Sequence, residues 1–143
     1  MLHEIDWHAR AKAVALPNRP FIDGKYVDSL SGESFACIYP GDGRLLTQVA
    51  SCNEADVDVA VRSARRAFDS GVWSRMAPAD RRRILLLFSE LILANREELA
   101  LLETLNVGKP IANAYNGDTV SAAACIAWYA EAIDKCYDEI APT

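Results

Sequence analysis

Cysteine thiols and histidine imidazoles are the side chains of this sequence that could form a nucleophilic or metal-binding centre. The four cysteines are Cys37, Cys52, Cys125 and Cys136, and the two histidines are His3 and His8. No cysteine pair has C-x-x-C spacing, and no histidine lies near Cys125 or Cys136 in sequence to act as a base. We therefore expect four reduced thiols, with Cys125 and Cys136 as small apolar side chains in the core of an alanine-rich helix.

Two glycine-containing segments partly match phosphate-binding loops. The segment Gly41-Asp42-Gly43 lacks the third glycine of G-x-G-x-x-G, and a strand rather than a helix is expected after it. The segment Gly108-Lys109-Pro110 has proline where a P-loop has serine or threonine, and no strand is expected before it. Both segments are interpreted as turns, so the residues alone predict no catalytic and no cofactor-binding side chain.

The composition excludes several classes of partner. The chain has 143 residues, of which 51% are hydrophobic and 24% charged, which is typical of one folded domain. The net charge of −5 argues against a nucleic acid or an anionic membrane as a partner, and the arginine runs 62–66 and 81–83 are interpreted as solvated helix faces. The apolar stretch 84–94 is too short to span a bilayer, and residues 1–6 do not resemble a signal peptide. We therefore expect a cytoplasmic protein.

The elements expected to position these side chains begin with two β-hairpins within residues 20–50. Apolar pairs flank Asp23-Gly24, a dipeptide that favours a type I′ turn. The second hairpin is expected to pair residues 35–39 with residues 45–50 across the turn at 40–43, and the two hairpins together are expected to form one small sheet. Residues 1–19 are expected to form an N-terminal arm with a short amphipathic helix.

After the hairpins the apolar residues repeat with a helical period, which predicts helices within residues 53–140. The first helix is expected to begin with a capping box of Asn53 and Asp56 and to end at Gly71. Pro78 is expected near the start of the second helix.

The last two helices are predicted from similar signals. Residues 95–98 are expected to start the third helix with another capping box, and Gly108 is expected to end it. The last helix is expected to run from about residues 117–118 to Tyr137.

The apolar surface of these helices exceeds what the hairpins could cover. Residues 84–88 and 91–93 make one helix apolar around most of its circumference, so this helix must be covered on several sides. The mismatch indicates that a covering surface is missing, supplied either by more chain or by another subunit. We therefore expect the isolated chain to self-associate or to be poorly soluble.

Several motifs in the same order resemble the aldehyde dehydrogenase superfamily. Residues 101–110, L-L-E-T-L-N-V-G-K-P, resemble its E-T-L-D-x-G-K-P signature, and residues 21–24 resemble its opening F-I-(N/D)-G hairpin. Residues 56–68 resemble its D-V-D-x-A-V-x-A-A-R-x-A-F helix. Residues 128–135, W-Y-A-E-A-I-D-K, are similar to bacterial enzymes for ω-amino aldehydes such as γ-glutamyl-γ-aminobutyraldehyde, whereas many other members carry Y-Y-A-G-W-A-D-K.

The resemblance implies an α/β parent protein that uses NAD or NADP to oxidise small aldehydes to carboxylic acids. It implies that residues 20–143 are the N-terminal part of a Rossmann-like NAD-binding domain, mainly α-helical with two N-terminal β-hairpins, and that the catalytic domain is absent. The family's W-N-F-P asparagine, E-L-G-G-K glutamate and G-Q-x-C cysteine do not occur in this sequence. We therefore expect no catalysis and no NAD or NADP binding by this segment alone, and a homodimeric or homotetrameric parent.

The resemblance also implies two sites. In several relatives a structural monovalent cation binds backbone oxygens and an acidic side chain at positions that correspond to Cys37, Ile38 and Asn106; the neutral Asn106 weakens such a site. The substrate entrance of relatives corresponds to Gly117, Asp118 and Ser121, where Asp118 could attract the substrate's amino group. Asp118 is also a suitable N-cap, and we favour that interpretation from the sequence.

Two hypotheses of function follow. The first is that the chain is the N-terminal part of an aldehyde-oxidising enzyme that acts on ω-amino aldehydes from polyamine breakdown. The alternative is a truncated, non-catalytic module that assembles or binds partners through its exposed helix faces.

Overall fold

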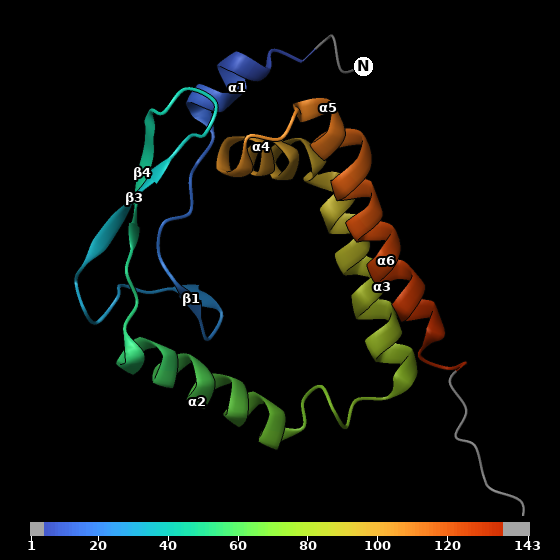
Figure 1. Ribbon diagram of the computed structural model, residues 1–143. Coiled ribbons are helices and arrows are strands. Elements are labelled where there is room, and N and C mark those ends of the chain that lie inside the picture. Colours follow the sequence, from blue (N-terminus) through green and yellow to red (C-terminus); the bar gives the residue numbers. More distant parts are fainter. Residues whose placement is uncertain (1–4, 136–143) are drawn as a thin grey trace, which may run out of the picture.

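The computed structural model describes residues 5–135, which form short strands and longer helices in an open, curved arrangement (Figure 1). The hairpins and one helix form one limb, and the remaining long helices form the other (Figure 1). In chain order the elements are α1 (Trp7–Ala13), β1 (Phe21–Ile22), β2 (Lys25–Tyr26), β3 (Ser34–Ile38), β4 (Leu45–Ala50), α2 (Glu54–Ser70), α3 (Pro78–Ala94), α4 (Arg96–Val107), α5 (Ile111–Asn113), the π-helical turn η2 (Ala114–Asp118) and α6 (Thr119–Ala132).

The strands form two separate hairpins. Asp23 and Gly24 have φ angles of 56° and 76°, which confirms the type I′ turn between β1 and β2. The strands β3 and β4 pair antiparallel, also as expected. The expectation of one small sheet is wrong, because no strand of the first hairpin pairs with the second among residues 5–135. The segment that joins the hairpins bonds to α2 instead: the Leu30 backbone N–H and the Ser29 hydroxyl donate to the Asp56 carboxylate.

The signals that begin and end α2 and α3 behave as predicted. Asn53 caps α2, and its capping box with Asp56 is complete, because the Asp56 carboxylate accepts from the Asn53 backbone N–H. Gly71 ends α2 in the left-handed conformation with a φ of 72°, and Pro78 is the first residue of α3.

The expected capping box at the start of α4 is wrong. The Asn95 side chain makes no cap hydrogen bond and instead donates to the carbonyl of Leu91, at the end of α3. Because Asn95 has a near-helical conformation, α3 and α4 follow each other almost without interruption, and the preceding turn supplies the acceptor. Gly108 ends α4 with a φ of 76°, as expected.

The last helical segment begins earlier than predicted. It starts with α5, passes through the π-helical turn η2 and continues as α6. The prediction that it runs to Tyr137 is wrong, because α6 ends at Ala132 and the described residues 133–135 form a turn. Asp118 has φ and ψ of −63° and −50° and makes no cap hydrogen bond, so its expected role as an N-cap is wrong. The backbone is already helical before Asp118, which leaves no free N-terminal N–H groups for its side chain to accept from.

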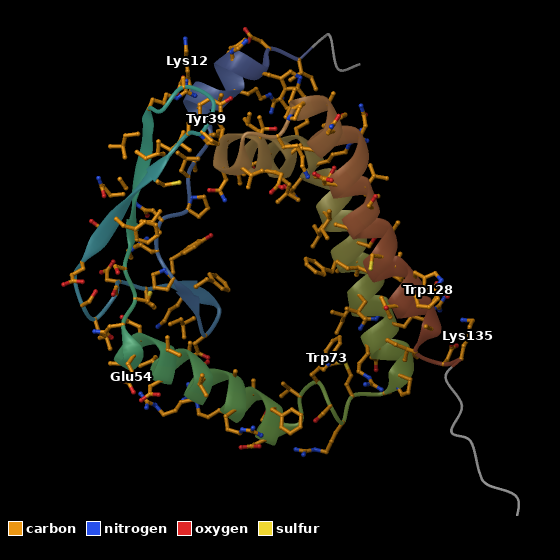
Figure 2. All side chains as sticks on the ribbon, viewed as in Figure 1. Lys12, Tyr39, Glu54, Trp73, Trp128 and Lys135 are labelled. Atoms are coloured by element: carbon orange, nitrogen blue, oxygen red, sulfur yellow. The ribbon has the colours of Figure 1, made fainter. Side chains whose placement is uncertain are left out.

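Small side chains dominate the core. The buried apolar residues are Ala100, Leu101, Leu105, Ala114, Ala123 and Ala130. On α3, by contrast, Phe88 and Leu91 are 51% and 50% exposed, and Trp128 on the outer side of α6 is 66% exposed (Figure 2). The expected excess of uncovered apolar surface is therefore confirmed for the described residues. Despite this surface, no helix within residues 5–135 is long and apolar enough to cross a membrane.

Candidate functional site

The thiols do not form a reactive centre among the described residues. Cys37 is partly buried, whereas Cys52 and Cys125 are exposed, and all three are free. The expectation of a core thiol at Cys125 is wrong: Ala123 faces α3, and a residue two positions later points to the other side of the helix. Cys136 and His3 lie outside the described residues. Within residues 5–135 no group of three or more His, Cys, Asp or Glu side chains could hold a metal ion.

The two glycine segments are turns, as the sequence indicated. Gly43 closes the turn between β3 and β4, and Gly108 ends α4. A Cβ atom on Gly108 would lie 2.9 Å from Cγ of Pro40, so glycine allows the end of α4 to approach the hairpin turn closely. The glycine of the E-T-L-N-V-G-K-P segment therefore lies at a close contact between the two limbs.

A dinucleotide site is not formed by the described residues. Such a site requires a parallel β–α–β unit with a glycine-rich loop at a helix N-terminus. Every strand within residues 5–135 instead pairs antiparallel with its neighbour in a hairpin. These residues do not fit a nicotinamide dinucleotide by themselves, and no reaction step through the cofactor follows from them.

A charged cluster lies where α4 ends and α6 begins. The Lys109 ammonium donates to Oδ2 of Asp118 and lies 3.7 Å from Oε1 of Glu103. The hydrogen bond to Asp118 raises the pKa of Lys109 above its ordinary value, because it stabilises the charged ammonium. We call these three residues the Lys109 cluster. It contains two carboxylates and one ammonium, and its formal charge is therefore −1.

The Lys109 cluster borders an apolar groove. The groove has a volume of about 650 Å³, and Phe88, Leu91, Ile92 and Leu99 form its apolar walls. The acidic residues Glu98, Glu103 and Asp118 are also among its lining residues. Of the sequence-predicted entrance residues, Asp118 therefore lines this groove, while Ser121 is exposed about one turn further along α6. An aliphatic chain with a positively charged end complements such a surface.

The π-helical turn η2 holds Asp118 in this position. The Thr119 hydroxyl donates to the carbonyls of Ala114 and Tyr115 at 3.2 and 3.0 Å, and Arg96 Nε also donates to the Tyr115 carbonyl at 2.9 Å. The Arg96 guanidinium stacks 3.6 Å from the centre of the Tyr115 ring. The Ala114 carbonyl also accepts from the Thr119 backbone N–H, so these side-chain contacts add to the backbone hydrogen bond of the π turn.

The residues expected at the cation site are brought together in part. The Cys37 thiol donates to Oδ1 of Asn106 over 3.7 Å, which joins β3 to the end of α4. Ile38 follows directly, at a register shift in the pairing of β3 with β4. The side-chain amide of Asn106 is therefore already in contact with a thiol.

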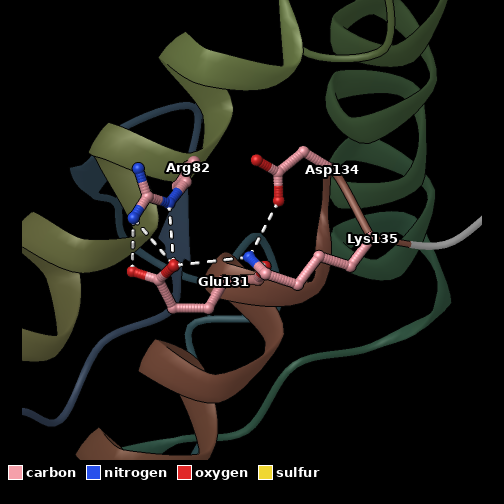
Figure 3. Close-up of polar contacts among 4 residues, drawn as sticks. All are labelled: Arg82, Glu131, Asp134 and Lys135. Carbon is pink, nitrogen blue, oxygen red and sulfur yellow. Dashed lines mark hydrogen bonds and ion pairs between the residues drawn. The ribbon is translucent and has the colours of Figure 1, made fainter.

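An ion-pair network that the sequence did not reveal joins α3 to α6 (Figure 3). Arg82 Nη2 donates to Oε1 and Oε2 of Glu131 at 2.6 and 2.7 Å, and Arg82 Nε donates to Oε2 at 3.1 Å. Lys135 lies 3.7 Å from Glu131 and 3.0 Å from Asp134. The interpretation of residues 81–83 as a solvated face is therefore incomplete, because Arg82 forms an ion pair with α6. The sequence feature that could have indicated this ion pair is the glutamate that replaces glycine in W-Y-A-E-A-I-D-K.

The sequence and the fold both match known proteins. The model of the aldehyde dehydrogenase family matches residues 26–143, so the chain belongs to this family of oxidoreductases. The chain is 43% identical over 142 residues to aminoacetaldehyde dehydrogenase of Pseudomonas aeruginosa, covering 99% of this chain and 29% of that protein. It is 42% identical to an NADP/NAD-dependent aldehyde dehydrogenase of Escherichia coli, covering 99% of this chain and 28% of that protein.

Solved structures confirm the expected fold. An indole-3-acetaldehyde dehydrogenase of P. syringae in complex with NAD+ has a TM-score of 0.93 and 53% identity. A γ-glutamyl-γ-aminobutyraldehyde dehydrogenase of Burkholderia cenocepacia has a TM-score of 0.93 and 47% identity, which agrees with the subgroup indicated by residues 128–135. Both matches cover 96% of this chain and 28% of the solved chain. The chain thus spans less than a third of the length of these relatives.

Proposed function

We propose that this chain is the N-terminal part of the NAD-binding domain of an NAD(P)+-dependent aldehyde dehydrogenase that oxidises ω-amino aldehydes. In this proposal residues 1–19 are an arm, residues 20–143 belong to the NAD-binding domain, and the catalytic domain follows. The proposal is supported by family membership and by the relative that acts on aminoacetaldehyde. The parent protein is a cytoplasmic homo-oligomer, a dimer or a tetramer, in which segments beyond this chain bind the cofactor.

The observation that carries the choice of substrate is the negative charge beside the groove. An ω-amino aldehyde has an aliphatic chain with an ammonium group at the end opposite its reactive carbonyl. The groove walls suit the aliphatic chain, and the Lys109 cluster, with its charge of −1, suits the ammonium group. In the proposed site Asp118 attracts the ammonium group and Ser121 lies beside the entrance.

We also propose a structural monovalent cation near the start of the second hairpin turn. The backbone oxygens of Cys37 and Ile38 and the side-chain oxygen of Asn106 would hold it. Oxygen ligands of this kind suit hard cations, and the contact between Cys37 and Asn106 brings two of the three residues together.

Steady-state kinetics of the complete reading frame that contains this chain test the substrate proposal. The Asp118→Asn variant should raise the KM for an amino aldehyde about 2- to 5-fold, the range expected for loss of an exposed ion pair. The KM for an uncharged aldehyde of equal length should not change. Asp58→Asn, which removes an exposed carboxylate on α2, is the matched control. An unchanged KM for the amino aldehyde in Asp118→Asn would remove Asp118 from substrate recognition.

A second candidate substrate is an uncharged aryl aldehyde. It is favoured by the 53% identity to indole-3-acetaldehyde dehydrogenase. The same kinetic comparison separates the two candidates, because an aryl aldehyde as the preferred substrate makes the Asp118→Asn variant indistinguishable from the wild type.

The alternative of a non-catalytic assembly module is favoured by the exposed apolar faces of α3 and α6. Reading the coding sequence beyond Thr143 tests it directly: a continuing frame with a W-N-F-P motif supports the enzyme, and a stop codon supports the module. Sedimentation of the isolated chain should reveal self-association, and millimolar NAD+ should leave its thermal midpoint unchanged. A clear rise of the midpoint would show that this segment binds the cofactor.

A further inference from the structure

Lys109 occupies the position that a ligand ammonium group would take in the proposed site. Its ammonium is itself a primary aliphatic amine, and it already contacts the carboxylates of Asp118 and Glu103. Its side chain is 36% exposed, and those of Asp118 and Glu103 are 45% and 42% exposed, so solvent and small cations reach all three groups. The contact is therefore one that an incoming ligand can replace.

The backbone around the cluster is fixed more firmly than the lysine side chain. Gly108 ends α4 in the left-handed conformation, and Pro110 follows Lys109 directly, which sets where the side chain of Lys109 leaves the backbone. At the other end, the hydroxyl of Thr119 and the guanidinium of Arg96 hold the π turn that carries Asp118. Lys109, in contrast, reaches its carboxylates through a flexible four-carbon chain, so its ammonium can move away while Asp118 stays in place.

We propose that Lys109 is a specificity-determining residue: its ammonium holds Asp118 and Glu103 until a ligand ammonium displaces it. This inference rests on the proposed recognition of amino groups by Asp118. Because Lys109 neutralises one of the two carboxylates, it weakens the attraction of the site for every cation. Only a ligand whose apolar chain also fits the groove gains enough from binding to displace it. Lys109 thus determines how large an apolar chain an amine must carry in order to bind.

Binding of n-pentylamine to the protein expressed from the complete reading frame tests this inference, with n-pentanol as the neutral probe. Amine and alcohol probes avoid the imine that an aldehyde would form with lysine. Isothermal titration calorimetry at low ionic strength measures the Kd of each probe, and the Asp118→Asn variant shows whether the measured binding is at this cluster. Lys109→Met keeps most of the aliphatic side chain and removes the charge, so it should lower the Kd of n-pentylamine about 2- to 5-fold.

Three further variants separate displacement from other causes. Lys109→Arg retains a cation and should leave the Kd close to the wild-type value. Lys135→Met removes an exposed, ion-paired lysine at a distance and should have no effect. Glu103→Gln removes the excess negative charge and should raise the Kd about 2-fold, opposite in sign to Lys109→Met.

The possible failures are distinguishable. If Asp118→Asn leaves n-pentylamine binding unchanged, the proposed recognition of amino groups fails. If Asp118→Asn weakens binding but Lys109→Met does not tighten it, only the role of Lys109 is overturned. Equal tightening of n-pentanol and n-pentylamine in Lys109→Met also overturns it, because the gain would then come from apolar contact.

Discussion

Each of the two limbs of the molecule is stabilised by a different kind of contact. Helices α3 and α6 run side by side and contact through small residues, with Ala123 and Ala130 exposed by 1% and 0% (Figure 1). Within this contact the Ser89 hydroxyl donates to the Ala123 carbonyl at 2.7 Å. Helix α2, in the other limb, leaves its apolar stripe exposed and is anchored at its start by the Asp56 carboxylate.

The difference shows that two physical effects position the elements of this chain. Close packing fixes α3 against α6, and this contact is sensitive to side-chain volume. Directional hydrogen bonds to one buried carboxylate position α2, and this contact is sensitive to charge and pH. Substitutions that change side-chain volume should therefore destabilise the limb that contains α3 and α6. Substitutions that change polarity should destabilise the limb that contains α2.

Enlarging a small residue between α3 and α6 should have the largest effect. Ala123→Leu places a bulky side chain where the helices meet and should lower the free energy of unfolding by about 1–3 kcal/mol. Ala124→Leu on the exposed side of α6 is the control and should change it by less than about 0.5 kcal/mol. Urea denaturation measures both values, and equal effects of the two variants would show that the α3–α6 contact is loose.

Removing the cap of α2 should have the next largest effect. The Asn53 side chain accepts from the backbone N–H groups of Ala55 and Asp56, so Asn53→Ala should cost about 1 kcal/mol. Asn95→Ala is the matched control, because the Asn95 side chain accepts from no N-terminal N–H group of α4 and makes one hydrogen bond, to the Leu91 carbonyl, so it should cost less. A larger loss in Asn95→Ala than in Asn53→Ala would reverse the assignment of the two asparagines.

The pH dependence of the α2 limb provides a third test. Hydrogen bonds from the backbone N–H groups of Leu30 and Asn53 hold the pKa of Asp56 below its ordinary value of 3.8. The stabilisation by the Asp56 carboxylate is therefore complete above the ordinary pKa and is lost as the pH falls through the lowered value. Unfolding measured between neutral and acidic pH should show this loss, and Asp56→Asn should remove it.

Breaking the Arg82–Glu131 ion pair should have the smallest effect. Arg82 holds the pKa of Glu131 below its ordinary value of 4.5, so this stabilisation is also lost only as the pH falls below that value. Both side chains are more than 40% exposed, and solvent therefore screens the pair. A double-mutant cycle with Arg82→Met and Glu131→Gln should give a small favourable coupling that decreases with salt. A coupling that exceeds the effect of Ala123→Leu would make charge, not packing, the main link between the helices.

Local signals in the sequence were sufficient for several elements. Asp23-Gly24, the Asn53 capping box, Gly71 and Pro78 were predicted correctly, because backbone conformations within a few residues determine them. The capping box predicted at Asn95 was wrong, because the Asn95 side chain donates to a carbonyl of the preceding helix and does not bond to the helix that it begins. The ion pair between Arg82 and Glu131 was not predicted, because the two residues are 49 positions apart in sequence.

The candidate site was less accessible to sequence reasoning than the fold. Asp118, Ser121, Ile38 and Asn106 were named through the family resemblance, not through a local pattern. The ion pair between Lys109 and Asp118 has no sequence signature, because a proline and a π turn separate the two residues and no regular periodicity relates them. Only the three-dimensional path of the chain brings them together.

The π turn at Ala114–Asp118 contains one residue more than an α-helical turn would use. Because the π turn winds this extra residue into a single turn, deleting Gly117, for example, should restore a regular helix and leave the orientation of the residues after it nearly unchanged. Ala123 and Ala130 would still face α3. The π turn therefore absorbs a length difference of one residue, and members of this family that lack one residue at this point should present the same face of the helix to the rest of the protein.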